Sequence, residues 1–203
     1  ARAEPHRPGM PATTPEKPSD RIAHIADLHF WRIVTNPFRM MNKRFFGNLT
    51  VVTRRRFHFM MENAEPWADA VAATGVTTVL LTGDFASTST DAEFELGAAF
   101  VRGLQRRGLR IALLPGNHDV YTFGAYRAKR FERHFAEFLP KGGYPSLETL
   151  PGGTPLLLIS TVCPRHFSAR GDIRDADVQR VGELLRQAGP RVIVGSHYPV
   201  LHT

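Results

Sequence analysis

Seven side chains that can bind a metal ion or move a proton stand at the ends of four aliphatic runs in this sequence. The runs read "HIADLH", "VLLTGD", "LLPGNHD" and "VIVGSH", and they supply Asp27, His29, Asp84, Asn117, His118, Asp119 and His197. Carboxylate, imidazole and amide donors in this mixture suit Mn²⁺, Fe or Zn²⁺ rather than Ca²⁺ or a metal bound by thiolates. Cys163 is the only cysteine, which excludes a cysteine-based zinc site and an internal disulfide.

A single residue of this kind has an ordinary structural explanation. An isolated Asp after a strand is most often a helix N-cap, and a lone His is most often a structural residue with its hydrogen bonds made. Four such polar endings in one chain are hard to attribute to capping, so the pattern favours a metal site.

The elements that must position these side chains can be predicted from the hydrophobic pattern. From Arg21 onward, short aliphatic runs alternate with amphipathic stretches. We predict strands within 21–27, 77–84, 109–117, 154–161 and 190–197, and helices near 62–74, 91–107, 123–138 and 175–188. This alternation is typical of a buried, parallel or mixed sheet covered by helices. Functional groups gather beyond the carboxyl ends of such strands, so we expect the polar endings to meet in space.

Length and composition predict one soluble domain. The chain has 203 residues and is 42% hydrophobic, without an apolar stretch of membrane-spanning length or a signal-peptide pattern. We therefore expect a cytoplasmic protein. Residues 1–20 are rich in Pro and poor in large apolar side chains, which predicts a flexible leader before a domain at 21–203.

Residues 30–61 form a basic, aromatic-rich insertion with seven Arg or Lys and no Asp or Glu. Together with a net charge of +7, this favours an anionic partner such as a phosphate ester, nucleic acid or an acidic membrane surface. A solvated basic surface explains the charges of this segment equally well. Its many Phe and Met side chains predict packing as a cap over the site or as a homodimer contact.

The ordered set DxH, GD, GNHD and a His at a strand end resembles the calcineurin-like metallophosphoesterase superfamily, over residues 21–203. The resemblance implies an α/β fold of the four-layer α/β/β/α sandwich type, with mixed sheets and a binuclear metal site at one sheet edge. It implies that Asp27 and His29 hold one metal ion, that Asp84 bridges both, that Asn117 and His197 hold the second, and that His118 is catalytic.

The chemistry that this resemblance implies is hydrolysis of a phosphate mono- or diester by in-line attack of a metal-bridging hydroxide. A carboxylate such as Asp84 can span two cations about 3.5 to 4 Å apart, and the cations lower the pKa of a shared water towards neutrality. Gly83 and Gly116 leave room for tight turns near the metals. We predict that Asp119 hydrogen-bonds one ring nitrogen of His118, and that protonated His118 stabilises the transition state or protonates the leaving group.

One motif of the superfamily does not occur in the sequence. Members carry a GHxH motif some tens of residues after the strand-borne His, whereas this chain stops at Thr203. His202 follows His197 too closely to replace that motif. We therefore expect a fragment that lacks the C-terminal part of the fold, with an incomplete metal site and reduced or absent activity.

Three functions stay open at this level. The segments "GDFAST" and "GNHD" differ from the GDxVDRG and GNHE of protein phosphatases. The chain is more similar to bacterial-type phosphodiesterases that act on small molecules such as cyclic nucleotides, nucleotides or lipid head groups. The basic charge also fits a nuclease. The missing histidines fit a non-catalytic scaffold, although the five predicted metal ligands are all present.

Overall fold

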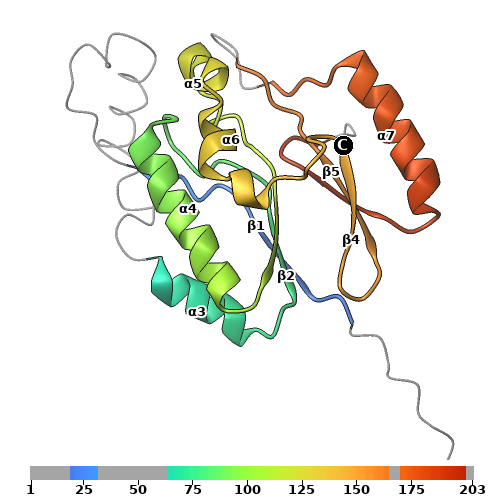
Figure 1. Cartoon of the computed structure of the whole chain (residues 1–203), viewed down its shortest axis with the longest axis horizontal. Helices are drawn as coiled ribbons and strands as arrows, with labels where there is room; N and C mark the ends of the chain where they lie inside the picture. The colour runs from blue at the N-terminus through green and yellow to red at the C-terminus, as the bar shows by residue number, and fades with distance from the viewer. Residues whose placement is uncertain (1–18, 32–63, 165–169, 200–203) are drawn as a thin grey trace, which may run out of the picture.

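The structure is a computed structural model that describes residues 19–31, 64–164 and 170–199 (Figure 1). Most of the predicted leader and basic insertion therefore lies outside the described residues. Two three-stranded sheets and several helices make up the described parts. In chain order the elements are β1 (Ile22–Ile25), α3 (Glu65–Ala73), β2 (Thr78–Leu81), α4 (Asp91–Arg106), β3 (Arg110–Leu113), α5 (Phe123–Arg127), α6 (Arg130–His134), the 3-10 helix η2 (Ala136–Phe138), β4 (Ser146–Thr149), β5 (Pro155–Ile159), α7 (Asp175–Ala188) and β6 (Ile193–Ser196).

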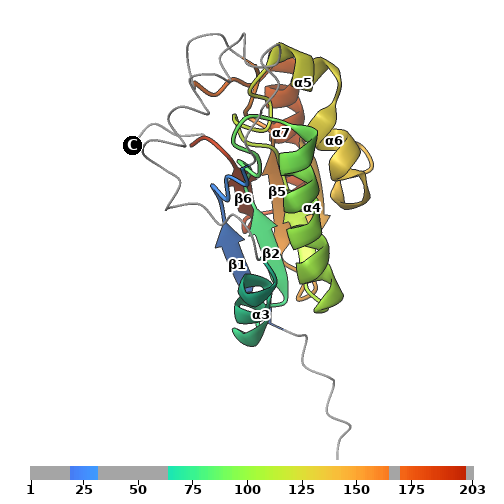
Figure 2. The ribbon, with the colours of Figure 1, turned by 90° about the vertical axis from the view of Figure 1, so that its left-hand side faces the viewer.

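The first sheet contains β1, β2 and β3, in that order and all parallel. In its register Thr78 of β2 pairs with Ile22 on one side and with Arg110 on the other. All four residues of β2 are buried, as expected for a central strand with an unbroken aliphatic run. Helices α3 and α4 cover one face of this sheet (Figure 2). The parallel order brings the carboxyl ends of all three strands to the same edge.

The second sheet is mixed, because β5 pairs antiparallel with β4 and parallel with β6. The hydrophobic pattern did not predict β4, whose sequence "SLET" contains one aliphatic residue. This strand forms through its pairing with the buried β5 and through a contact from the first sheet, where Arg110 lies 2.8 Å from Glu148. The predicted mixed α/β fold is therefore confirmed in its general form.

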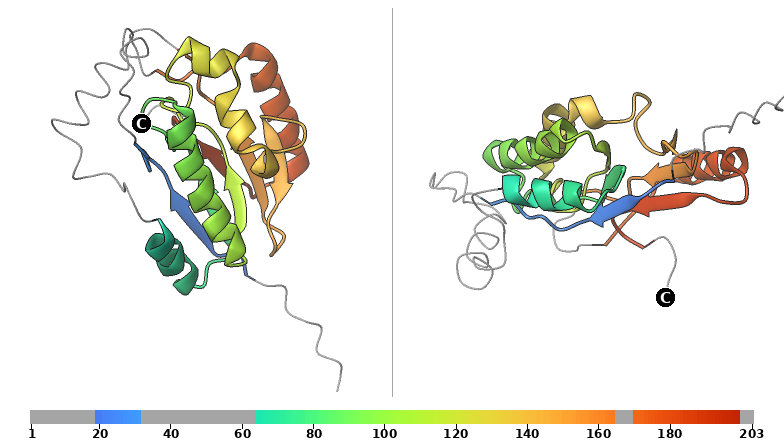
Figure 3. Two further views of the ribbon diagram at one scale, coloured as in Figure 1. Left: turned by 60° about the vertical axis from the view of Figure 1, so that its left-hand side comes forward. Right: turned by 90° about the horizontal axis from the view of Figure 1, so that it is seen from below.

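Three hydrophobic clusters join the sheets and helices. The first lies between sheet one and helices α3, α4 and α6, and the third lies between sheet two and α7 (Figure 3). The second cluster joins the two sheets, with Leu80 and Ala112 from the first and Leu156 and Leu158 from the second. Because side chains alternate along a strand, the neighbouring Leu157 belongs to the third cluster instead.

The predicted helix at 123–138 is divided into α5, α6 and η2. Lys129 adopts a left-handed backbone with φ of 47° between the first two of these elements. Phe131 of α6 and Phe135, the residue directly after this helix, lie in the core. Their ring centroids are 5.9 and 4.6 Å from that of Phe85. These two aromatic residues pack into the core from a short helix and the residue after it rather than from one continuous helix.

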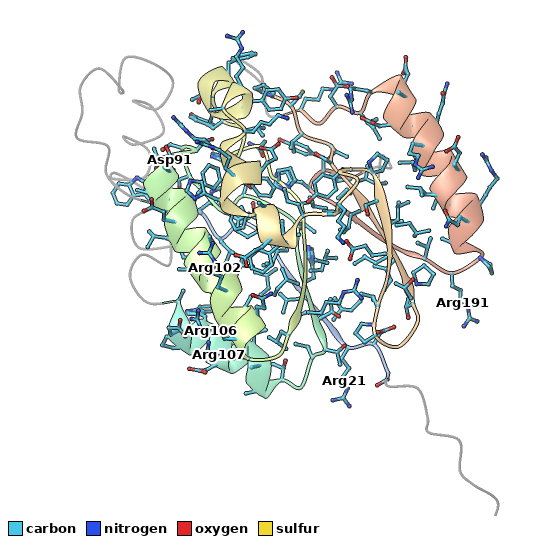
Figure 4. The ribbon with its side chains drawn as sticks, in the orientation of Figure 1. Arg21, Asp91, Arg102, Arg106, Arg107 and Arg191 are labelled. Atoms are coloured by element: carbon cyan, nitrogen blue, oxygen red, sulfur yellow. The ribbon has the colours of Figure 1, made fainter. Side chains whose placement is uncertain are left out.

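Helices α3 and α4 are also joined by ion pairs on their exposed sides (Figure 4). Arg106 lies 2.9 Å from Glu65, and Arg107 lies 2.7 Å from Asp69. Exposed pairs of this kind contribute little to stability, so the buried cluster beneath them holds the two helices together. Within the described ranges, no helix has the length and apolar character needed to cross a membrane.

Candidate metal centre

The polar endings of the strands meet at the carboxyl edge of the first sheet. The loop after β1 runs beside the loop after β2, with the N–H groups of Asp27 and His29 donating to the carbonyls of Gly83 and Asp84 at 3.2 and 2.8 Å. The loop after β3 joins them through the His118 N–H, which donates to Asp84 Oδ1 at 2.8 Å. These main-chain contacts bring three separate segments to one point.

Asp84 lies between two imidazole rings, with one carboxylate oxygen towards each. His29 Nε2 is 3.6 Å from Asp84 Oδ2, and His197 Nε2 is 3.7 Å from Asp84 Oδ1. On the outer sides, His29 Nε2 lies 3.7 Å from Asp27 Oδ1, and His197 Nε2 lies 2.9 Å from Asn117 Oδ1. The structure therefore brings together all five residues that were predicted to bind metal.

His118 lies in the same cluster. Its ring centroid is 4.8 Å from that of His29, with the two rings nearly perpendicular. Donor atoms of His29, Asp84 and His118 all lie within 4.8 Å of one another, so these three residues could hold a metal ion. The geometry therefore allows His118 to act as a ligand as well as in the catalytic role predicted from its motif.

Two of these histidines contact a main-chain carbonyl through Nδ1. His197 Nδ1 is 2.8 Å from the Thr82 carbonyl, and His118 Nδ1 is 2.8 Å from the Ser87 carbonyl. A carbonyl only accepts hydrogen bonds, so each ring donates its Nδ1 proton to that carbonyl. In a neutral His118 ring this leaves the Nε2 lone pair available, whereas His197 Nε2 faces Asn117 Oδ1. Neither contact could be predicted from the sequence, because a main-chain carbonyl has no residue-specific signature.

The electrostatics of the centre are dominated by the buried Asp84 carboxylate, which is 3% exposed. Burial raises the pKa of Asp84, and the neighbouring His118 and His197 oppose that shift. The Asp27 side chain, in contrast, is 64% exposed. A cation bound between these groups would compensate the buried negative charge of Asp84.

Three of the predicted ligands have a left-handed backbone. The φ angles of Asp27, His29 and Asp84 are 57°, 49° and 58°. Such angles are uncommon outside glycine and cost roughly 1 to 3 kcal/mol each. Backbone outliers of this kind cluster at functional sites, so the coincidence of three of them in two neighbouring loops supports a binding site here.

The loops can approach closely because two of their residues are glycines. A Cβ on Gly83 would lie 2.2 Å from the Gly116 nitrogen, and a Cβ on Gly116 would lie 2.1 Å from Asp84 Oδ1. The predicted need for glycine at these turns therefore has a specific cause, which is the contact between the β2 and β3 loops.

Replacing Gly116 with Ala should displace Asp84 and weaken the centre. We expect the variant to lose about 1 to 3 kcal/mol of unfolding free energy, the usual range for overpacking, and to bind Mn²⁺ more weakly. Urea unfolding and metal titration measure the two effects. Gly124→Ala is the matched control, because nothing lies within 4 Å of its added Cβ. Equal metal affinity in Gly116→Ala and the wild type would contradict this argument.

The predicted role of Asp119 is wrong. Its carboxylate accepts hydrogen bonds from the main-chain N–H groups of Asp84, Ala86 and Gly116, at 2.8, 2.9 and 2.8 Å. The ring nitrogen of His118 that it was expected to orient contacts Ser87 instead. The buried Asp119 carboxylate lies within hydrogen-bond distance of buried main-chain N–H groups in the loops after β2 and β3, and these groups take the place of the imidazole as its partners. Asp119 therefore joins the loops after β2 and β3.

Burial and the nearby Asp84 carboxylate raise the pKa of Asp119, while its main-chain N–H donors oppose the shift. Asp119→Ala leaves three buried N–H groups without their acceptor, at about 1 to 3 kcal/mol each. Relief of the buried charge offsets part of this cost. We expect a net loss of at least about 3 kcal/mol in unfolding free energy, measured by urea denaturation.

Glu95→Ala is the matched control for this prediction. Glu95 is an exposed acidic residue of α4, where replacement with Ala should change stability by less than about 0.5 kcal/mol. If Asp119→Ala were as stable as this control, the three hydrogen bonds would not hold the loops together.

Two tyrosines next to the centre contact its histidines. The Tyr121 ring is stacked on that of His118 at 5.3 Å and 7°, and the Tyr198 ring contacts His197 at 4.9 Å. Both rings therefore pack against histidines of the centre.

A mixed α/β fold with a cluster of nitrogen and oxygen donors at the carboxyl edge of its parallel sheet defines a candidate metalloprotein. The profile of the family described as calcineurin-like phosphoesterase matches residues 20–202, nearly the whole chain. The chain belongs to the calcineurin-like phosphoesterase family. Among curated proteins, no sequence matches the chain significantly. Family membership indicates metal-dependent hydrolysis of a phosphoester.

Proposed function

We propose that this protein is a metal-dependent phosphoesterase that hydrolyses a phosphate mono- or diester of a small molecule. The observation that carries the proposal is the position of Asp84, whose two carboxylate oxygens face His29 and His197 at 3.6 and 3.7 Å. A carboxylate between two nitrogen donors suits a ligand shared by two cations. Family membership supports the same reaction class.

The donor set around Asp84 fits two metal ions. Asp27 and His29 would hold one ion, Asn117 and His197 the other, and Asp84 both. Oxygen and imidazole donors without thiolate favour Mn, Fe or Zn. When bound, such ions activate water as a nucleophile for in-line attack and neutralise charge on the phosphoryl oxygens. Because Asn117 is neutral, the loaded site keeps the positive charge that attracts a phosphate.

His118 would act on the leaving group. The Ser87 carbonyl holds the proton of the neutral ring on Nδ1, so Nε2 is the nitrogen that can take up a second proton and deliver it. The main-chain N–H of His118 donates to Asp84. This hydrogen bond fixes the His118 main chain relative to the predicted ligands. A protonated imidazole there could stabilise the transition state or protonate the departing alkoxide.

We also propose the finer architecture of the fold, the location of the protein and its preferred ester. The order of the three hydrophobic clusters supports a four-layer α/β/β/α sandwich. A cytoplasmic location and a phosphodiester preference remain predictions. The basic insertion at 30–61 was predicted to interact with an anionic membrane, nucleic acid or a second copy of the chain. Residues 32–61 of this insertion lie outside the described residues.

The test is metal analysis of the protein expressed from its full-length gene, followed by hydrolysis of bis-p-nitrophenyl phosphate with and without Mn²⁺. We expect bound metal and hydrolysis that EDTA abolishes and Mn²⁺ restores. A protein that neither binds metal nor hydrolyses this ester would be the non-catalytic scaffold. DNA binding that weakens steeply between about 50 and 200 mM salt would favour the nuclease instead.

A further inference from the structure

We propose that Ser89 is a positioning residue for His118, an inference that rests on the proposed function. Its hydroxyl donates to the main-chain carbonyl of His118 at 2.6 Å and accepts from the main-chain N–H of Tyr121 at 2.8 Å. One oxygen atom thus holds both ends of the His118–Tyr121 turn.

The same short segment holds the His118 side chain. The Ser87 carbonyl contacts His118 Nδ1 at 2.8 Å, two residues before Ser89. His118 is therefore fixed at its ring by residue 87 and at its main chain by residue 89. Because both contacts come from one loop, a shift of the Ser89 hydroxyl moves the main chain of His118 relative to the carbonyl that sets its tautomer.

The Ser89 hydroxyl also supports the ring packed against His118. The Tyr121 N–H, which donates to the Ser89 hydroxyl, also lies 3.3 Å from the His118 carbonyl. The hydroxyl, the N–H and the carbonyl therefore form one hydrogen-bonded set. The Tyr121 ring is stacked on the imidazole with an angle of 7° between the planes. The hydroxyl therefore fixes the stacked pair through the main chain of both residues.

Ser89 is itself held in place. It is fully buried, with 0% exposure, and its φ of 58° is uncommon for a residue other than glycine. Arg130 donates to the Ser89 carbonyl at 3.0 Å, and its Nε lies 3.3 Å from Asp91 at the start of α4, which Figure 4 labels. The Ser89 main chain is therefore held by Arg130 of α6, which is itself paired with the start of α4. A residue with its main chain held in this way has little freedom to move, as a positioning group requires.

The test compares Ser89→Ala and Ser89→Gly with the wild type. Both variants remove the hydroxyl, but Gly adopts φ of 58° without strain, so the two should differ in melting temperature. We expect the same fall in kcat in both, about 10- to 100-fold as for other residues that orient a catalytic group. KM should change by less than about 2-fold, because ground-state binding of the substrate is retained.

A second measurement does not require activity. In the metal-free protein, ¹⁵N spectra of the His118 imidazole should show one tautomer, with the proton on Nδ1, in the wild type. They should show mixed tautomers or exchange broadening in both variants. If the wild type hydrolyses no phosphoester, the proposed function fails and these spectra alone decide the role of Ser89.

Thr88→Val is the matched control. It removes a buried hydroxyl one residue away that donates to Glu93 rather than to His118. A kcat loss as large in Thr88→Val as in the Ser89 variants would overturn the proposal, because loosening of the loop would then suffice. Unchanged kcat and unchanged His118 spectra in both Ser89 variants would overturn it as well.

Discussion

Asp84→Asn should lower phosphoesterase activity by at least about 10³-fold, more than the loss of one electrostatic donor usually costs, and it should lower the metal content. Asp84 contacts both halves of the candidate centre, with one carboxylate oxygen towards His29 and the other towards His197. An amide has no negative charge to share between two cations, so both halves should bind more weakly. Metal analysis and the rate of p-nitrophenol release measure the two effects.

The stability of the metal-free variant separates this effect from misfolding. Burial raises the pKa of Asp84, so its ionised form costs stability at pH values above that raised pKa, and Asn cannot ionise. Asn also tolerates a φ of 58° and can still accept from the His118 N–H. At pH 8 and without metal, we therefore expect Asp84→Asn to melt at the same temperature as the wild type or higher.

Asp69→Asn is the matched control for the change of charge, because Asp69 pairs with Arg107 on the exposed side of α3. This variant should keep its metal and its activity. Full metal content and activity in Asp84→Asn would contradict a role for Asp84 at the centre of the site.

The strands and the positions of the site residues could be predicted because each depends on a local pattern. Long aliphatic runs predicted β1, β2, β3, β5 and β6, and parallel pairing of the first three brings Asp27, Asp84 and Asn117 to one edge. The rule that functional groups follow the carboxyl ends of strands was therefore sufficient to group them.

Features that depend on tertiary contacts could not be predicted in the same way. Strand β4 forms by pairing with β5 although "SLET" has little strand character of its own. The helix expected at 123–138 is interrupted at Lys129, because Phe131 and Phe135 pack into the core. In both cases the packing of distant residues outweighs the local preference.

The error at Asp119 has a related cause. Asp and His are adjacent in "GNHD", which suggested a contact between their side chains. In the structure Asp119 accepts from main-chain N–H groups of the glycine loops, and the contact with His118 Nδ1 comes from the Ser87 carbonyl. Partners made of main-chain atoms leave no trace in the residue types.

His118→Asn should reduce kcat by about 10² to 10⁴-fold, the usual contribution of a general acid or base, while the metal content stays at the wild-type level. The side chain of His118 contacts the Ser87 carbonyl through Nδ1, which leaves Nε2 for proton transfer. Asn cannot transfer a proton there at neutral pH. Its main-chain N–H can still donate to Asp84, so the position of that carboxylate should be kept.

The metal content decides between the two roles that the geometry allows for His118. Its donor atom lies within 4.8 Å of donor atoms of His29 and Asp84, close enough for a shared ion. If His118→Asn lowers the metal content by as large a factor as it lowers kcat, His118 is a ligand and the catalytic assignment fails. His134→Asn, which removes a histidine that contacts Asp91 at 3.1 Å, controls for the loss of an imidazole elsewhere and should change neither quantity. Retained metal with a low kcat would place His118 at the leaving group.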